Sequence, residues 1–318
     1  MATDNINAPM PPQRDKWYYR LLGASLDAVA RLPLPVLYAV ADVLFFLIYH
    51  VARYRRKVVA DNIAGSFPEM TAREQRKVVR GFYRHFADYI VETVKLPRMT
   101  DEEMRRRMEF VNIGIVDRLW DEGKSIAAYF SHCGNWEWGT SITLWTQRRP
   151  EEGGIFAQIY RPLRNRWFDR YFLRLRSRFH SRSFSKASAL RDLIRLRGEG
   201  LPSITGFMSD QKPSINEPSH VVKFLNRPTA MIPGTETVAR KLGMAVVYMD
   251  MEKPRRGHYR VTMRLIAENA RERPEGSITD RYAAMLEESI RRTPHIWLWS
   301  HKRWKYPVQY PNTEPKKE

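Results

Sequence analysis

The 318-residue sequence predicts an α/β fold: a mixed, largely parallel sheet flanked by helices, with an N-terminal membrane-embedded helical segment. Two observations lead to this prediction. From about Phe110 onward, short apolar runs alternate with stretches of helical periodicity, which is typical of strands joined by helices. An apolar run bounded by basic residues precedes this region. Apolar residues make up 43% of the chain, so a sizeable core is expected.

The N-terminal part divides into a leader and an apolar segment. Residues 1–16 are polar and contain prolines, and we expect a disordered leader there. Residues 17–57 are expected to form a membrane-associated helical segment, with a helix from Trp17 to Ala30, a break at Pro33 and an apolar run from Val36 to Val51. These 16 residues would rise about 24 Å as a helix, less than the roughly 30 Å hydrocarbon core of a bilayer.

Basic residues flank the apolar segment on both sides: Arg14, Lys16 and Arg20 before it, and Arg53, Arg55, Arg56 and Lys57 after it. Positive charge at both ends opposes translocation and favours a segment embedded in one leaflet, facing the cytoplasm. A buried core helix is the alternative. The single cysteine, Cys133, excludes an internal disulfide framework and fits a reducing compartment.

Residues 58–318 are expected to form the α/β domain. It begins with a long amphipathic helix from Thr71 to Leu96, in which Thr71 and Glu74 have the spacing of a capping box. The predicted strands are Ser125–Phe130, Gly154–Tyr160, Ile204–Met208, Ala245–Met251 and Tyr259–Ile266. The predicted helices between and after them are Trp136–Gln147, Leu163–Arg178, Ala187–Arg197, Thr235–Leu242 and Ile278–Arg292.

One strand end carries a candidate catalytic pair. The apolar run that starts at Ser125 leads into His132, and Gly134 permits a sharp turn. Asn135 is a favoured helix N-cap, which would place Glu137 in the first helical turn. From there, Glu137 is expected to hold one imidazole nitrogen of His132 and leave the other as a general base. Spacing alone fits a structural histidine and a solvated glutamate equally well.

The string from His132 to Glu137, His-Cys-Gly-Asn-Trp-Glu, resembles the HxGNWE signature of the lipid A late acyltransferases, the lauroyl/myristoyl transferase family. Further blocks resemble that family in the same order: Tyr160-Arg-Pro-Leu163 with Asn165, Met208-Ser-Asp-Gln-Lys212 with Phe224-Leu-Asn226 and Pro233-Gly234, and the closing stretch Pro294–Lys305. The resemblance covers about Trp17 to Lys305. At Cys133 the chain departs from the family, in which a bulkier residue often stands.

The resemblance implies a fold like that of the glycerolipid acyltransferases. It also implies transfer of a fatty acyl chain from an acyl–acyl carrier protein to a hydroxyl of a lipid A precursor, at the cytoplasmic face of the inner membrane. Such a transfer from a thioester needs no metal or other cofactor, and the sequence contains no metal-ligand cluster or nucleotide-binding loop. An acyltransferase acting on another lipid, such as a phosphatidylinositol mannoside or an amino-acid lipid, is the alternative within the superfamily.

Five further residues are candidates for substrate binding. Asp210 and Gln211 end a predicted strand and are expected to share the crevice of His132. Asp210 would orient Arg161 or a sugar hydroxyl, or cap a turn; the sequence leaves these open. Arg161 follows another predicted strand, and with Arg164 and Asn165 it is expected to hold anionic groups of the acceptor or of the carrier's phosphopantetheine.

The chain contains 54 Lys and Arg against 35 Asp and Glu, a formal charge of +19, which indicates anionic partners such as acidic membrane lipids. Residues 161–182 hold eight arginines and one acid among aromatic residues, a composition that suits an anionic surface or RNA. No RNA-recognition motif accompanies it, so no nucleic acid partner is expected. A non-enzymatic basic protein of the membrane surface, or one that binds RNA, is the alternative of another class.

Two smaller questions stay open in the sequence. Cys133 beside His132 allows an acyl-enzyme mechanism, although a packed turn thiol is the other interpretation. The closing aromatic residues suit either a membrane interface or core packing: Trp297, Trp299, Trp304 and Tyr306.

Overall fold

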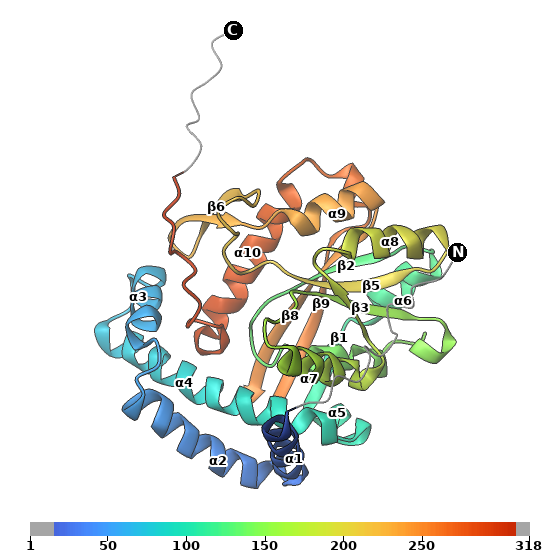
Figure 1. The fold of residues 1–318 in the computed structure, drawn as a ribbon. Coiled ribbons are helices and arrows are strands. Elements are labelled where there is room, and N and C mark those ends of the chain that lie inside the picture. The colour runs from blue at the N-terminus through green and yellow to red at the C-terminus, as the bar shows by residue number, and fades with distance from the viewer. Residues whose placement is uncertain (1–15, 310–318) are drawn as a thin grey trace, which may run out of the picture.

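The computed structural model describes residues 16–309, and a seven-stranded sheet forms the centre of this part of the chain (Figure 1). Its strand order is β1-β9-β8-β2-β5-β3-β4, and neighbouring strands run parallel apart from the antiparallel pair β8–β9. The strands are β1 (Met108–Val111), β2 (Ile126–Phe130), β3 (Ile155–Tyr160), β4 (Arg182–Ser185), β5 (Ser203–Met208), β8 (Ala245–Arg255) and β9 (His258–Ala267). A separate antiparallel hairpin consists of β6 (His220–Phe224) and β7 (Arg227–Met231). The predicted α/β fold with a largely parallel sheet is therefore confirmed.

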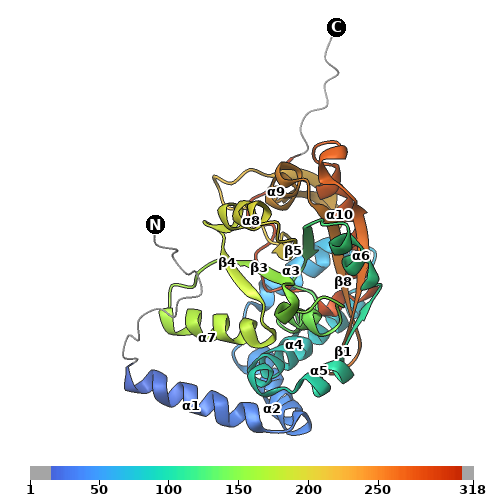
Figure 2. The same ribbon diagram turned by 90° about the vertical axis from the view of Figure 1, so that its right-hand side faces the viewer.

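Helices cover the sheet and extend from it on the N-terminal side (Figures 1 and 2). They are α1 (Trp17–Arg31), α2 (Leu34–Phe46), α3 (Arg56–Ser66), α4 (Ala72–Lys95), α5 (Asp101–Arg107), α6 (Gly114–Asp121), α7 (Arg166–Arg176), α8 (Ala189–Gly198), α9 (Gly234–Leu242) and α10 (Ser277–Arg292). The predicted capping box of α4 is present: the Thr71 hydroxyl accepts from the Glu74 amide at 3.3 Å, and the Glu74 carboxylate accepts from the Thr71 amide at 2.7 Å.

All five predicted strands are present, with ends that differ by a few residues. The sequence missed β1, β4 and the hairpin strands β6 and β7, which are four or five residues long and only partly buried. Such short strands carry too few apolar positions to show an alternating pattern.

The helix predicted over Trp136–Gln147 is wrong in type. A 3₁₀ helix spans Trp138–Leu144 instead. Hydroxyl side chains explain this, because Thr140 donates to the Glu137 carbonyl at 2.9 Å and Ser141 donates to the Trp138 carbonyl at 2.6 Å. Side-chain bonds to the backbone three residues earlier compete with a regular α-helix.

Helices α1 and α2 are separated by the predicted break at Pro33, and α2 lies along α4 (Figure 1). The apolar helix begins two residues earlier than expected: Leu34–Val51 is continuous, ending in a π-helical turn over Leu47–Val51. By length and composition its 18 residues are enough to cross a membrane, and 22% of it is buried.

The buried side of α2 packs against the domain through Leu34, Leu37, Ala41 and Phe45. Its other side leaves large apolar side chains exposed: Val36, Val40, Val43, Phe46, Leu47 and Val51. This segment is therefore only partly buried: one side packs in the core, and the other side exposes apolar side chains.

Candidate active site

Two neighbouring parallel strands end side by side and each is followed by a candidate residue. Phe130 of β2 is paired with Met208 of β5. His132 and Asp210 each lie two residues beyond these partners. Because parallel strands end at the same edge of a sheet, the pairing brings the two side chains together although 78 residues separate them.

Asp210 holds His132 through both its backbone and its ring. The carboxylate accepts from the His132 amide at 2.9 Å, and its other oxygen lies 2.7 Å from Nδ1 of the imidazole. Burial alone would raise the pKa of Asp210, but the charge and hydrogen bonds of His132 and the Trp297 indole outweigh it and lower the pKa to about 2. An ionised Asp210 can only accept, so it fixes the proton of a neutral His132 on Nδ1.

A proton on Nδ1 leaves Nε2 of His132 as the ring nitrogen with a free lone pair. Gln211 places its Nε2 at 3.2 Å from Nε2 of His132, a distance at which the amide donates to that lone pair. The His132 side chain is 16% exposed, so the imidazole is not sealed in the core. A substrate hydroxyl that replaced the Gln211 amide would donate its proton to the same lone pair.

Sequence reasoning missed the role of Trp297. Its indole donates to Asp210 at 2.9 Å. The segment that carries it is held against the motif, because the Gly134 amide donates to the Ile296 carbonyl at 3.0 Å and the Leu298 amide donates to the His132 carbonyl at 3.1 Å. Nothing in a sequence pattern signals this long-range pairing.

The exposed fractions of the closing tryptophans show whether these side chains pack in the core or lie at the surface. Trp297 is 3% exposed and Trp299 is 0% exposed, so both belong to the core rather than to a surface that faces a membrane. Tyr306 is 42% exposed and remains available at the surface.

The predicted contact between Glu137 and His132 is wrong. Glu137 is buried and forms a two-point ion pair with Arg176 of α7, with Nε at 2.9 Å and an Nη at 2.7 Å from its carboxylate oxygens. Burial alone would lower the pKa of Arg176, but Glu137 raises it above its usual range. The physical reason is that a bidentate guanidinium compensates a buried carboxylate better than one imidazole nitrogen does.

The turn of the motif is built as expected at Gly134, but Glu137 and not Asn135 stands at the N-cap position. Gly134 has φ +62°, and a Cβ there would lie 2.5 Å from the Met251 sulfur, so a larger residue is excluded. The Asn135 side chain accepts from the Trp138 amide at 3.3 Å, as an N-cap does, and donates to buried Glu92 at 2.9 Å. Glu137 is the residue that precedes the 3₁₀ helix rather than part of its first turn.

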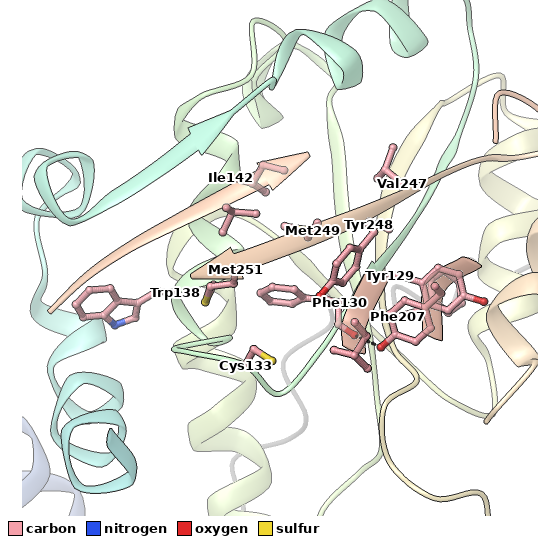
Figure 3. Close-up of a cluster of buried hydrophobic side chains, with 14 of the residues drawn as sticks. Tyr129, Phe130, Cys133, Trp138, Ile142, Phe207, Val247, Tyr248, Met249 and Met251 are labelled. Atoms are coloured by element: carbon pink, nitrogen blue, oxygen red, sulfur yellow. Dashed lines mark hydrogen bonds between the residues drawn. The ribbon is translucent and has the colours of Figure 1, made fainter. Parts of the chain in front are cut away.

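Cys133 points into the core. It is 1% exposed and lies among buried side chains that include Phe130, Tyr248 and Met251 (Figure 3). Burial raises its pKa well above that of an ordinary thiol. A thiol in this environment is neither ionised nor accessible to a bulky acyl donor.

The residues of the second block lie after β3, the strand on the far side of β5 from β2. Arg161 and Arg164 are exposed, and neither forms an ion pair with a carboxylate of residues 16–309. Asn165 caps α7 by accepting from the Trp167 and Phe168 amides at 3.0 and 3.3 Å. Of the roles that the sequence left open for Asp210, a contact with Arg161 is not formed, because His132 and Trp297 occupy its carboxylate.

Among residues 16–309, no group of three or more His, Cys, Asp or Glu side chains is placed to hold a metal ion. The site is thus a histidine whose Nδ1 is held by a buried acid and whose Nε2 meets the Gln211 amide, at the carboxyl ends of the parallel strands β2 and β5. That arrangement suits removal of a proton from a hydroxyl.

Comparison with known proteins identifies the family. Residues 13–306 match the family model described as bacterial lipid A biosynthesis acyltransferase. The chain belongs to this family. It is also similar to the lipid A biosynthesis lauroyltransferase of Escherichia coli K12, with 25% identity over 281 residues that cover 87% of this chain and 88% of that protein. The resemblance seen in the motifs is therefore confirmed, and the chain is an acyltransferase of the lipid A biosynthesis family.

Proposed function

We propose that this acyltransferase moves a fatty acyl chain from an acyl–acyl carrier protein to a hydroxyl of a lipid A precursor, with His132 as the general base. The observation that carries the proposal is the pairing of Nδ1 of His132 with buried Asp210 at 2.7 Å, which leaves Nε2 as the basic nitrogen. The family match and the lauroyltransferase relative support the acceptor class.

In the proposed mechanism, the acceptor hydroxyl displaces the Gln211 amide from Nε2 of His132. As the hydroxyl oxygen attacks the thioester carbonyl, its proton passes to Nε2. Asp210 stabilises the imidazolium that forms, since its carboxylate stays ionised. The tetrahedral intermediate then collapses, the C–S bond breaks, and the proton on Nε2 moves to the carrier's thiolate. The products are an ester and a free thiol, and no metal or redox cofactor takes part.

The exposed arginines that follow β3 are proposed to bind phosphate. Arg161 and Arg164 lie beyond the strand next to β5, at the edge of the sheet that carries His132. Guanidinium groups bind phosphate oxygens at two points, and both the acceptor and the carrier's phosphopantetheine supply phosphate. We assign Asn165 a supporting role, because its amide already caps α7 and donates to the Tyr19 hydroxyl at 2.7 Å.

Residues 17–57 are proposed to hold the enzyme in the cytoplasmic leaflet without spanning it. The middle of α2 is tied to the domain, because Arg256 bonds to Asp42 at 2.8 Å and the Tyr38 hydroxyl donates to buried Glu92 at 3.0 Å. A helix with polar bonds to a water-soluble domain along one side cannot be surrounded by hydrocarbon. Its exposed valines and phenylalanine suit insertion of one face into the leaflet.

The test of the transfer is a reaction with purified protein, acyl–acyl carrier protein and lipid A precursor, followed by mass spectrometry of the lipid. An added acyl group on the precursor is the expected result. Lipid A from cells with and without the gene should show the same mass difference. Acylation of a phosphatidylinositol mannoside or an amino-acid lipid, with none on the precursor, would contradict the proposed acceptor.

The test of membrane attachment uses the Cys133→Ala protein with one cysteine placed near Arg20 or near Arg53. Both positions should be shielded from an impermeant reagent in intact spheroplasts. Labelling near Arg20 but not near Arg53 would show that the segment spans the membrane. Detergent should release the protein, whereas high salt alone should not, because salt screens charges and leaves apolar burial intact.

A further inference from the structure

A cavity lies on the side of α7 opposite the Arg176 side chain that bonds to Glu137. It is a groove of about 540 Å³ between α1, the end of α4 and α7. Figure 2 shows α1 running alongside α7. Arg174 lines this groove, whereas Arg176, about 200° further round the helix, bonds to Glu137. The groove is therefore separated from the motif by the thickness of α7.

Arginines dominate the polar lining of the groove: Arg20, Arg98, Arg170, Arg174 and Arg178. Part of this charge is neutralised within the protein. Asp27 accepts from Arg98 at 2.6 Å, and Asp101 accepts from Arg178 at 2.8 Å. Arg20 and Arg174 are exposed and have no carboxylate partner within residues 16–309, so the groove retains positive charge.

The rest of the lining is apolar and aromatic. Trp167 stacks between Tyr19 and Tyr171, with ring centroids 5.5 Å apart in each pair. Gly23 and Ala24 of α1 leave the space in front of these rings open. A Cβ on Gly23 would lie 3.4 Å from the Trp167 ring, so a larger side chain there would fill the groove.

Apolar side chains are also exposed on the N-terminal helices outside the groove. Trp17 and Leu21 of α1 are 75% and 60% exposed. A ligand in the groove meets apolar and aromatic side chains together with the guanidinium groups of Arg20 and Arg174. Phospholipids with a net negative charge present the same combination of chemistry, acyl chains next to an anionic phosphate.

We propose that this groove binds an anionic phospholipid of the bilayer, with its phosphate between Arg20 and Arg174 and its glycerol and upper acyl chain against the aromatic wall. The site would hold α1 onto α7 in the membrane-bound enzyme. It is distinct from the His132–Asp210 pair, because α7 lies between the groove and the ion pair of Arg176 with Glu137. Its existence does not depend on which lipid the enzyme acylates.

Native mass spectrometry of the full-length protein in detergent tests the proposal, with phosphatidylglycerol and phosphatidylcholine as probes. Phosphatidylglycerol should bind at least tenfold more tightly than phosphatidylcholine. The variant Arg20→Gln/Arg174→Gln should lose about tenfold in affinity for phosphatidylglycerol. Gly23→Leu should lose a similar factor by filling the groove without changing the charge.

The matched control is Arg191→Gln/Arg195→Gln, which removes the same charge from an exposed face of α8. Equal losses in the control and in Arg20→Gln/Arg174→Gln would mean that only net charge matters, which would overturn the proposal. Full displacement of phosphatidylglycerol by inorganic phosphate at equal concentration would overturn it too, because the lipid portion would then contribute nothing. His132→Ala should keep phosphatidylglycerol binding, so failure of the catalytic proposal leaves this one testable.

Discussion

Two buried carboxylates stand near His132, one after β5 and one in the turn after β2, and they have different partners. Asp210 is 1% exposed and bonds to the imidazole, whereas Glu137 is 2% exposed and bonds to Arg176 of α7. Glu137 is five residues from His132 in the chain, and Asp210 is 78 residues away. The more distant acid in the chain is the one in contact.

The difference shows what a local motif determines. The motif fixes the turn, because Gly134 adopts φ +62° and the Asn135 side chain accepts from the Trp138 amide. It does not fix which acid meets the histidine, because that depends on the register of β2 against β5. We infer that Asp210 positions His132, while Glu137 anchors the turn to α7.

The largest expected effect is that of His132→Ala. Loss of the general base should lower kcat by about 10²- to 10⁴-fold, since general base catalysis contributes on this order. The measurement is the rate of acyl transfer to the lipid A precursor, with circular dichroism as a check of folding. A folded variant that keeps more than half the wild-type rate would exclude His132 as the base.

Asp210→Asn should have the next largest effect, a loss of about 10²- to 10³-fold in kcat with little change in KM. The asparagine is nearly the same size but cannot stabilise the imidazolium. A double-mutant cycle with His132→Ala should be strongly non-additive, because the two side chains act as a unit. If instead Glu137→Gln is the substitution that fails to add to His132→Ala, the assignment of the two acids must be exchanged.

The low pKa of Asp210 also predicts a pH dependence of stability. Its folded-state pKa is about 2, below the usual unfolded value of about 3.9. The stabilisation from its ionised form is therefore present above about pH 4 and is lost as the pH falls towards 2. Chemical denaturation should show wild type more stable than Asp210→Asn at neutral pH, with the difference shrinking across that acid range. A difference that stays constant down to pH 2 would contradict the ion pair.

The pair of Glu137 and Arg176 should matter more for stability than for chemistry. Glu137→Gln or Arg176→Met alone should lower the free energy of unfolding by about 2 to 3 kcal/mol, because each leaves a mostly buried charge without its partner. The rate of transfer should fall only about tenfold, through displacement of the turn. The double variant should recover much of the stability. A single variant that retains stability but loses activity a thousandfold would give Glu137 a direct catalytic role.

How far the sequence predicts this molecule depends on the range of the interaction. Local patterns predicted five of the strands, the break at Pro33 and the capping box at Thr71, since neighbouring residues decide these features. The placement of His132 and Asp210 at strand ends was also predictable. Their contact was not predictable, because it depends on the order of the strands in the sheet. The hydrogen bond from the Trp297 indole to Asp210 was not predictable either, because Trp297 lies over 80 residues further along the chain.

The smallest expected effect is that of substituting Cys133, the residue next to His132. Cys133 follows His132 directly, yet successive residues point in different directions, and its thiol lies in the core with the Gly134 turn beyond it. Burial raises its pKa, which keeps the thiol protonated and weakly nucleophilic. Cys133→Ala should therefore change the transfer rate by less than about threefold, although it removes a buried atom and should cost about 1 kcal/mol of stability.

Intact-protein mass spectrometry after addition of the acyl donor should find no acyl adduct on the wild-type chain. A thioester adduct that forms and decays at the rate of turnover would mean that the acyl group passes through Cys133, and that His132 activates a thiol rather than the acceptor hydroxyl.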